Sequence, residues 1–262
     1  MTKISIITPC LNAVQFIERT IESVLSQTGD FELEYIVVDG VSNDGTLDII
    51  KRYEGRLRWV SEKDPGQTAA INKGLRMTTG DIVAFLNADD LYKPGTLERV
   101  VKAFTDPKVQ WLFGKCDIID IHDVEVRKAI TSYKNYHLRR ASLSRILAEN
   151  FISQPAVFWR RSVMQEVGFL DEAEHYVMDY EYWLRIWQRF EPLFIDEYLS
   201  SFRWYETSKS GSGFDKQFND ELRVARKYGK GHTMAILKHR FNFYKIVGAY
   251  TVMAWVRKLG AG

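Results

Sequence analysis

The stretch that decides the fold is "DIVAFLNADDLYKPG", residues 81–95. Its first half is an apolar run typical of a buried strand, and the run ends in two adjacent carboxylates, Asp89 and Asp90. Pro94 follows near the first turn of a helix predicted over 93–106. Like charges side by side at a strand end repel each other. The stretch therefore raises the question of what compensates them.

Three strand–helix units precede this one. The hydrophobic pattern predicts strands over 4–9, 33–40 and 57–64, and helices over 14–27, 43–53 and 66–80, with Asp44 as a cap. Such alternation is typical of an α/β fold, a mostly parallel sheet with helices on both faces. Ligands of these sheets bind beyond the carboxyl ends of the strands.

Carboxylates gather at that predicted edge. Asp39, Asp64 and the Asp89–Asp90 pair each lie at or just after the end of a predicted strand. A single Asp there usually forms a turn or caps a helix, but several at one edge favour a ligand site. Mg²⁺ or Mn²⁺, held by carboxylates and substrate phosphates, would neutralise them. No GxxxxGK[ST] and no GxGxxG motif is present, so the pattern favours a metal-bridged nucleoside diphosphate over a P-loop or a dinucleotide site.

Composition limits the alternatives. The 262 residues suffice for one large α/β domain with extra elements, and a net charge of +2 argues against a nucleic-acid partner. Two cysteines, Cys10 and Cys116, predict no disulfide framework and suit a reducing cytosol. The sequence shows no signal-peptide pattern and no apolar run long enough to span a bilayer. We therefore expect a cytoplasmic protein, with the inner face of the membrane as a further location.

Seven stretches together resemble the inverting glycosyltransferases of the GT-A fold, often called family two. They occur in family order across about residues 3–187: "SIITPCLNA", "EYIVVDGVSNDGT", "VSEKDPGQTAAINKG", "DIVAFLNADDLYKPGTL", "SQPAVFWRRSV", "GFLDE" and "MDYEYWLR". The resemblance implies a Rossmann-like central sheet and transfer of a sugar from a nucleotide-sugar, most commonly a UDP-sugar. It also implies a saccharide or lipid-linked acceptor and a role in the synthesis of cell-surface polysaccharide or glycolipid.

The resemblance assigns the nucleotide and metal residues by position. Thr8 and Pro9, which end the first strand, match the family's nucleotide-contacting turn, and Asp39 and Asp64 match residues on the base side. Asn87, Ala88 and Asp89 fall on the family's DXD motif, with Asp89 as the ligand of Mn²⁺ or Mg²⁺ and Asp90 in support. Asn87 departs from the commoner Asp, which removes one charge from the motif.

The catalytic residue implied by the resemblance is Asp179, near the start of a helix predicted in 175–187. An acidic residue there also suits the helix macrodipole. As the family's base, Asp179 would take the proton of the acceptor hydroxyl, with Glu181 in a supporting role. Tyr182, Ile186 and Trp187 are predicted to face inward.

Three more residues are assigned supporting roles, namely Gln154, Arg203 and Ser208. Arg203 and Ser208 belong to the stretch 200–212, which reads either as a loop that closes over the diphosphate or as a solvated loop. Tyr205 stands where relatives often carry His, and the QxxRW pattern of processive synthases is absent. The absence favours the transfer of one sugar per acceptor.

The resemblance fades after about residue 213. The expected organisation is a catalytic domain over 1–212, with a nucleotide-binding half (1–105) and an acceptor-binding half (106–212), followed by a helical extension over 213–262. Basic and aromatic residues flank the apolar run 246–256, which suits a helix on a membrane surface equally with one packed on the domain or on a second subunit of a homodimer. A nucleotidyltransferase and a non-catalytic nucleotide-sugar binding module remain as rival functions.

Overall fold

The computed structural model describes residues 1–206, 214–242 and 244. The first half runs through β1 (Thr2–Cys10), α1 (Ile17–Leu25), β2 (Phe31–Asp39), α2 (Thr46–Lys51), β3 (Arg58–Ser61), α3 (Gln67–Met77), β4 (Ile82–Phe85), β5 (Leu91–Tyr92) and α4 (Thr96–Ala103). The second runs through β6 (Trp111–Ile119), α5 (Lys128–Leu138), α6 (Leu143–Ala148), η1 (Gln154–Ala156), β7 (Val157–Arg160), α7 (Val163–Val167), α8 (Met178–Trp187), β8 (Leu193–Arg203) and α10 (Phe214–Tyr228).

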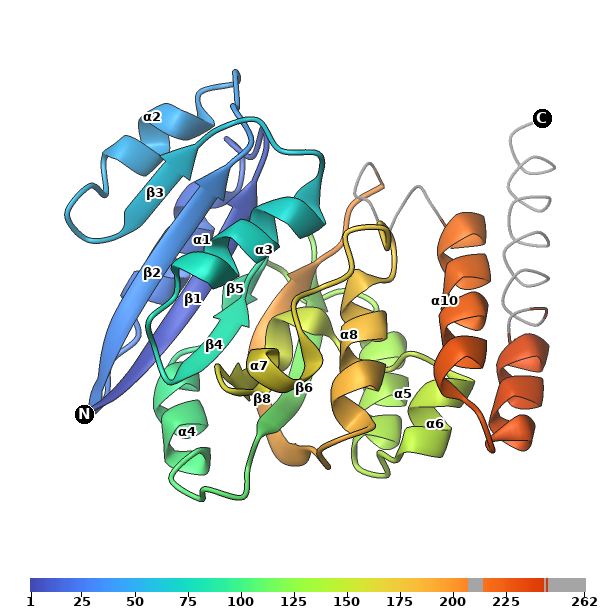
Figure 1. Ribbon diagram of the computed structural model, residues 1–262. Helices are drawn as coiled ribbons and strands as arrows, with labels where there is room; N and C mark the ends of the chain where they lie inside the picture. Colours follow the sequence, from blue (N-terminus) through green and yellow to red (C-terminus); the bar gives the residue numbers. More distant parts are fainter. Residues whose placement is uncertain (207–213, 243, 245–262) are drawn as a thin grey trace, which may run out of the picture.

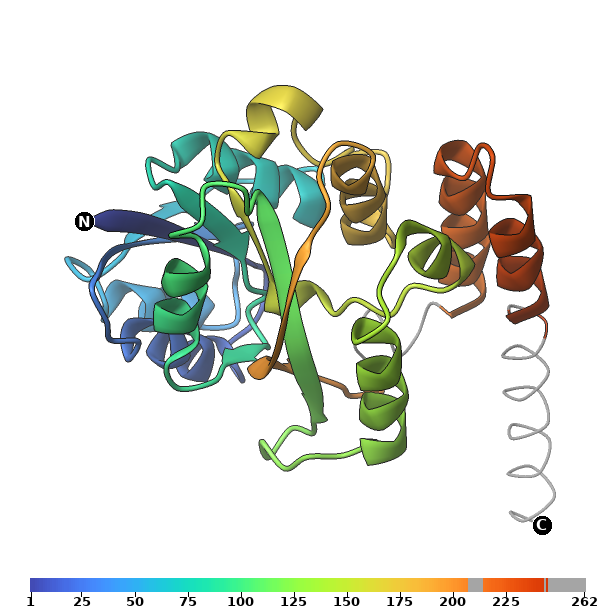
Figure 2. The same cartoon turned by 90° about the horizontal axis from the view of Figure 1, so that it is seen from below.

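One eight-stranded sheet joins the two halves, in the order β3-β2-β1-β4-β7-β6-β8-β5 (Figures 1 and 2). The first four strands of that order pair in parallel, as predicted. β7 is antiparallel to both of its neighbours, β6 and β8 are parallel, and β5 is antiparallel to β8. The fold is therefore the predicted α/β sandwich of helices around a mostly parallel sheet.

Alternation along the strands divides the core between the two faces of the sheet. On β2, Ile36 and Val38 pack with α3 and α8, whereas Tyr35 and Val37 pack with α1, α2 and α4. Because both faces of the sheet are covered, residues on both sides of these strands are apolar. The first strands therefore read as continuous apolar runs. Tyr182, Ile186 and Trp187 of α8 are buried, as predicted.

Two expected boundaries were wrong. β1 runs through Cys10, so Thr8 and Pro9 lie inside a buried strand and do not end it. Residues 200–203 are strand and not loop, because β8 pairs with β6 as far as Arg203. Ser208 and the rest of that stretch beyond residue 206 lie outside the described residues.

The C-terminal part is helical where it is described. α10 packs on α8 and α6, and residues 233–242 form a further helix beside α10 at the edge of the molecule (Figure 1). The apolar run 246–256 lies outside the described residues. Among the described helices, none is long and apolar enough to cross a bilayer. Cys10 and Cys116 are buried free thiols.

Candidate active site

The loops after β2 and β3 meet at the carboxyl edge of the sheet. Asp39 is fully buried, and its carboxylate accepts hydrogen bonds from Ser61 Oγ at 2.6 Å and from the Ser42 hydroxyl at 2.5 Å. Asp64 accepts from the Gly66 backbone N–H at 2.8 Å, which shapes the entry into α3. A Cβ at Gly40 would lie 3.0 Å from Asp64 Oδ2, so glycine permits this close approach. The structure brings Asp39 and Asp64 together, and both shape the loops in which they lie.

Thr8 is held differently. Its hydroxyl is 3.0 Å from the Tyr35 hydroxyl inside the core, so the side chain does not face the sheet edge where Asp64 lies. Nearby, burial and the negative charge of Asp39 raise the pKa of the Cys10 thiol, which therefore stays protonated at neutral pH.

The carboxylates of Asp89 and Asp90 have separate surroundings. Asp90 is fully buried, and it accepts from the Arg203 backbone N–H at 2.9 Å and from Asn87 Nδ2 at 3.2 Å. Asp89 lines a cavity, and its Oδ2 accepts a hydrogen bond from the Tyr205 hydroxyl oxygen 3.0 Å away. Desolvation raises the pKa of both carboxyls, and the charge of Asp89 raises that of Asp90 further.

Arg203 fixes this loop in place. Its guanidinium donates to the Asp89 carbonyl at 2.8 Å and to the Asp120 carbonyl at 2.5 Å, and it pairs with Asp123 at 2.5 Å. Because the side chain is fully buried, Arg203 belongs to the rigid floor of the site. The expectation that it travels on a closing loop was wrong.

Asn87 and Gln154 link the two halves of the chain at this point. Asn87 Nδ2 donates to Gln154 Oε1 at 3.1 Å, Asn87 Oδ1 accepts from Gln67 at 2.8 Å, and Gln154 donates to the Phe85 carbonyl at 2.5 Å. The Ala88 carbonyl accepts the Thr20 hydroxyl at 2.8 Å. The strand-end loop is thereby held between α1, α3 and η1.

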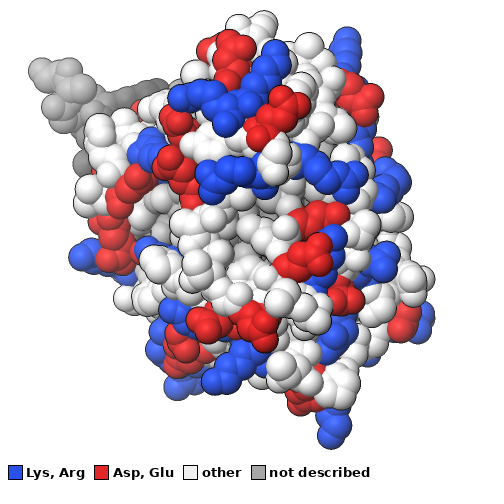
Figure 3. All heavy atoms as spheres, turned by 90° about the vertical axis from the view of Figure 1, so that its left-hand side faces the viewer, with Lys and Arg blue, Asp and Glu red and all other residues white. Residues whose placement is uncertain are grey.

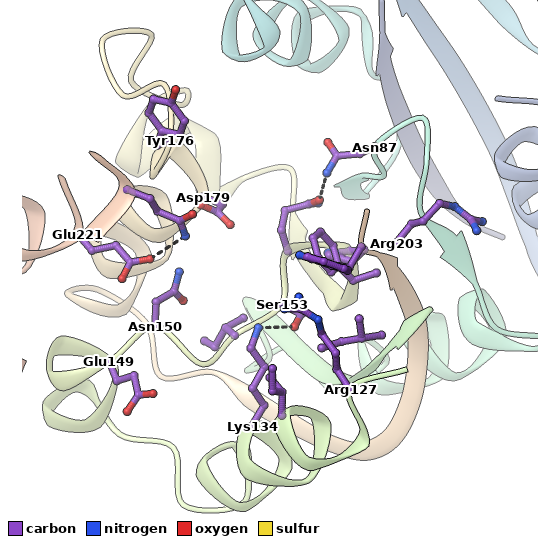
Figure 4. Close-up of a pocket in the computed structure, with 18 of the residues that line it drawn as sticks. Asn87, Arg127, Lys134, Glu149, Asn150, Ser153, Tyr176, Asp179, Arg203 and Glu221 are labelled. Carbon is purple, nitrogen blue, oxygen red and sulfur yellow. Dashed lines mark hydrogen bonds between the residues drawn. The ribbon is translucent and has the colours of Figure 1, made fainter. Parts of the chain in front are cut away.

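A cavity of about 580 Å³ opens beside these residues. Asp89, Asn87, Gln154, Arg203 and Asp179 all line it. In Figure 4, Asn87 and Arg203 lie on one side of the cavity and Asp179 on another. Asp179 is in the first turn of α8, where its Oδ1 accepts the Tyr180 backbone N–H at 2.8 Å. The structure therefore brings together in one cavity the two residues to which the resemblance assigns metal binding and proton transfer.

Glu181 has a different environment. It is 1% exposed, forms an ion pair with Arg185 at 2.7 Å and accepts a hydrogen bond from the Tyr228 hydroxyl. Its carboxylate ties α8 to α10 and is absent from the cavity lining. Its contacts are therefore those of a residue that holds the two helices together.

The sequence reasoning missed two further carboxyls that line the cavity, Glu149 and Glu221 of α10. Glu221 accepts from Gln217 Nε2 at 3.1 Å and lies on the same side of the cavity as Asp179 in Figure 4. Burial, followed by the charge of Asp179, raises the pKa of Glu221 to about 7. The helical spacing of residues 214–228 could have indicated an amphipathic helix, but nothing in it marked a cavity residue.

Two cations also enter the cavity from α5 and the residue before it. Arg127 stacks on the Trp204 ring at 3.4 Å, and Lys134 donates to Ser153 Oγ at 3.1 Å. Figure 4 shows both side chains directed toward Ser153. Neither residue was predicted, because no motif marks them.

The Asp89 carboxylate suits a divalent cation. It is an oxygen ligand facing the cavity, and the adjacent Arg203 guanidinium is already paired with Asp123. Among the described residues no cluster of three or more His, Cys, Asp or Glu could hold a metal. An ion here would therefore take most of its ligands from phosphates and water, as Mg²⁺ commonly does.

Comparisons with known proteins give the chain's relationships. An uncharacterised glycosyltransferase of Nostoc sp. is 31% identical over 178 residues, which are 66% of this chain and 55% of that protein. A PGL/p-HBAD biosynthesis glycosyltransferase of Mycobacterium bovis is 28% identical over 271 residues, 97% of each chain.

Solved structures show the same fold. Staphylococcus aureus TarS in complex with UDP-GlcNAc superposes with a TM-score of 0.66 at 20% identity, covering 85% of this chain and 65% of that one. The mannosyltransferase PcManGT of Pyrobaculum calidifontis, in complex with GDP-Man and Mn²⁺, gives a TM-score of 0.66 at 18% identity, covering 100% and 81%. The sequence model of "Glycosyl transferase family 2" matches residues 5–168. The chain belongs to glycosyl transferase family 2.

Proposed function

We propose that this protein transfers one sugar from a nucleotide-sugar to an acceptor hydroxyl, with inversion at the anomeric carbon. The observation that carries the proposal is the shared cavity of Asp89 and Asp179. A direct displacement needs a base on one side of the anomeric carbon and a stabilised leaving group on the other. In this proposal the carboxylate of Asp179 is the base, and the carboxylate of Asp89, which lines the same cavity, would hold the cation that stabilises the leaving group.

In this proposal the acceptor oxygen attacks the anomeric carbon while the bond from that carbon to the phosphate oxygen breaks. Asp179 accepts the acceptor's hydroxyl proton, and the nucleoside diphosphate leaves. A divalent cation bound at Asp89 would stabilise the charge of the leaving group. The loops of Asp39 and Asp64 hold the base and ribose, and Arg203, Asn87 and Gln154 keep the floor of the site rigid.

UDP is the nucleotide we propose, and Mn²⁺ or Mg²⁺ the cation. The similar structures support both, since TarS was solved with UDP-GlcNAc and PcManGT with Mn²⁺. The GDP-Man in the second structure makes the base the first property to test. A lipid-linked or saccharide acceptor agrees with the name of the mycobacterial relative, which places that protein in PGL/p-HBAD biosynthesis.

The experiment combines binding and turnover. A thermal-shift screen of UDP, GDP and dTDP with Mn²⁺ identifies the nucleotide, because a ligand that binds only the folded state raises the melting temperature. Nucleotide release from a panel of the matching nucleotide-sugars, with Mn²⁺ or with EDTA, then tests transfer. Release of diphosphate that EDTA abolishes supports the proposal. Release of pyrophosphate from a nucleoside triphosphate and a sugar 1-phosphate, supplied in place of the nucleotide-sugar, would indicate a nucleotidyltransferase. Binding of the nucleotide-sugar without release would indicate a binding module.

A further inference from the structure

The helix at residues 233–242 packs one of its faces against the rest of the protein. His239 is 3% exposed and its Nδ1 lies 2.8 Å from the Leu147 carbonyl. Asn242 donates to the Ala148 carbonyl at 3.3 Å and lines the cavity that contains Asp179. This inner face is therefore part of the cavity wall.

The outer face of the same segment carries an apolar stripe, which we define as Met234, Leu237, Phe241 and Tyr244. The four side chains are between 54% and 78% exposed. Their spacing of three, four and three residues puts them on one side of a helix. Single exposed apolar residues are common, but a contiguous stripe usually marks an interaction site.

The chain segment that carries the stripe has charges of one sign. From Leu222 to Gly262 the sequence has nine Lys and Arg and no Asp or Glu, whereas the rest of the chain has a net charge of −7. Lys238 and Arg240 lie beside the stripe and are exposed. Lys and Arg alternate with Asp and Glu on the side of the molecule that lies at the left of Figure 1, away from this helix (Figure 3).

We propose that the apolar stripe, with Lys238 and Arg240, docks on an anionic lipid bilayer. An amphipathic helix with apolar residues on one side and basic residues around them is the type that lies in a membrane interface. A second copy of this chain would bring two strongly basic segments together, which disfavours a dimer through this face. The described helices offer no membrane span, so attachment here would be peripheral.

Docking in this orientation would place the cavity beside the membrane. The helix has Asn242 in the cavity wall on one face and Phe241 on the other, only one residue away. The acceptor hydroxyl would then belong to a lipid-linked molecule that enters from the bilayer, and this part of the inference rests on the proposed function. The docking itself can be tested without turnover.

The experiment is flotation of the full chain with vesicles of phosphatidylcholine alone or mixed with phosphatidylglycerol. We expect binding only to the mixed vesicles, with loss at high salt because surface charge is screened. K238Q/R240Q should weaken the partition coefficient by roughly 30-fold, since each Lys or Arg near an anionic surface contributes about 1 kcal/mol. L237Q/F241S should weaken it at least about tenfold through lost apolar burial.

Matched controls are K51Q/K108Q for charge and I121Q/V124S for exposed apolar area, all away from the stripe. Both controls should bind the vesicles as the unmodified chain does. Failure of the unmodified chain to bind mixed vesicles, or equal binding by L237Q/F241S, would overturn the proposal. A dimer that L237Q/F241S dissociates, without any change in flotation, would identify a second copy as the occupant and also overturn it. Nucleotide release measured without vesicles reports separately on the proposed function.

Discussion

At the residue scale, the two adjacent carboxylates at the end of β4 have different roles. Asp90 turns into the protein, where the Arg203 N–H and Asn87 hold it. Asp89 turns to the cavity, where Tyr205 is its partner. The sequence alone could not separate them, because Arg203 and Tyr205 lie more than a hundred residues further along the chain. The repulsion between the two carboxylates is reduced because Asp90 is hydrogen-bonded inside the protein while Asp89 faces the cavity.

This difference predicts opposite effects of two substitutions. Asp90→Ala leaves the Arg203 N–H and the Asn87 amide without their acceptor, so the free energy of unfolding should fall by about 1–3 kcal/mol. Asp89→Ala should leave stability nearly unchanged but remove Mn²⁺-dependent binding of UDP and nearly all transfer. Urea unfolding and calorimetric titration with Mn²⁺ or EDTA measure the two effects. Full activity of Asp89→Ala in EDTA would contradict the metal assignment.

Asp179→Asn tests the proposed base. Asn keeps the side-chain shape but cannot accept a proton at neutral pH, so turnover should fall by roughly 10²–10⁴ while the donor dissociation constant hardly changes. A capping role predicts little effect, because Asn is itself a good cap. Glu181→Gln is the matched control, and its effect should be on stability, since Glu181 binds Arg185 and Tyr228. Near-normal turnover of Asp179→Asn would exclude it as the base.

Glu221 predicts a pH dependence of stability. Its pKa is raised to about 7 in the folded state from an ordinary 4.5, so the folded protein binds more protons than the unfolded chain between these values. The free energy of unfolding should therefore fall as pH rises from about 4.5 to 7, by roughly 2–4 kcal/mol from this group. Urea unfolding of Glu221→Gln across the same range gives the comparison. The variant should lack this part of the decline, and parallel curves for the two proteins would contradict the assignment.

At the scale of elements, the sequence predicts the first half better than the second. Strands β1, β2 and β4 read as apolar runs, and helices α1 and α3 have apolar residues at a period of 3.6. β8 was not predicted, because Asp196, Glu197 and two serines interrupt its apolar pattern. A helical extension was predicted from residue 213, but the bounds of α10 were not, because that helix is mostly polar. The motif residues of the site could be found, whereas Glu221, Arg127 and Lys134 could not, since only tertiary packing brings them to the cavity.

The packing of α3 on β1 depends on Gly74. A Cβ at this position would lie 2.4 Å from Ile7 Cγ2, in the core and on a stiff β-branched side chain. Gly74→Ala should therefore lower stability by about 1–2 kcal/mol, since overpacking outweighs the better helix propensity of Ala. Gly74→Ala combined with Ile7→Ala should recover part of the overpacking penalty, measured against Ile7→Ala alone. Additive losses in a urea-unfolding cycle would contradict the steric explanation.

At the scale of the whole molecule, the residues proposed to bind the nucleotide and the C-terminal helices have different contacts. The groups that hold Asp39, Asp64 and Asp89 lie between Asp39 and Tyr205. His239 and Asn242 contact Leu147, Ala148 and Glu149, the ring of Tyr180 and the cavity wall. The two parts of the molecule are therefore expected to respond independently to change.

Removal of residues 238–262 tests this independence. The truncated chain loses the contacts of His239 and Asn242, so its melting temperature should fall by roughly 2–8 °C. Its dissociation constant for UDP with Mn²⁺ should stay within about twofold of the full chain, because distant sites without shared partners act additively. Vesicle binding should be lost, since Lys238, Arg240 and Phe241 are removed. H239A/N242A is the control for the packing contacts alone and should lower the melting temperature while leaving vesicle binding intact. A folded truncated chain that no longer binds UDP would mean that the C-terminal helices shape the nucleotide site, which would contradict the separation argued here.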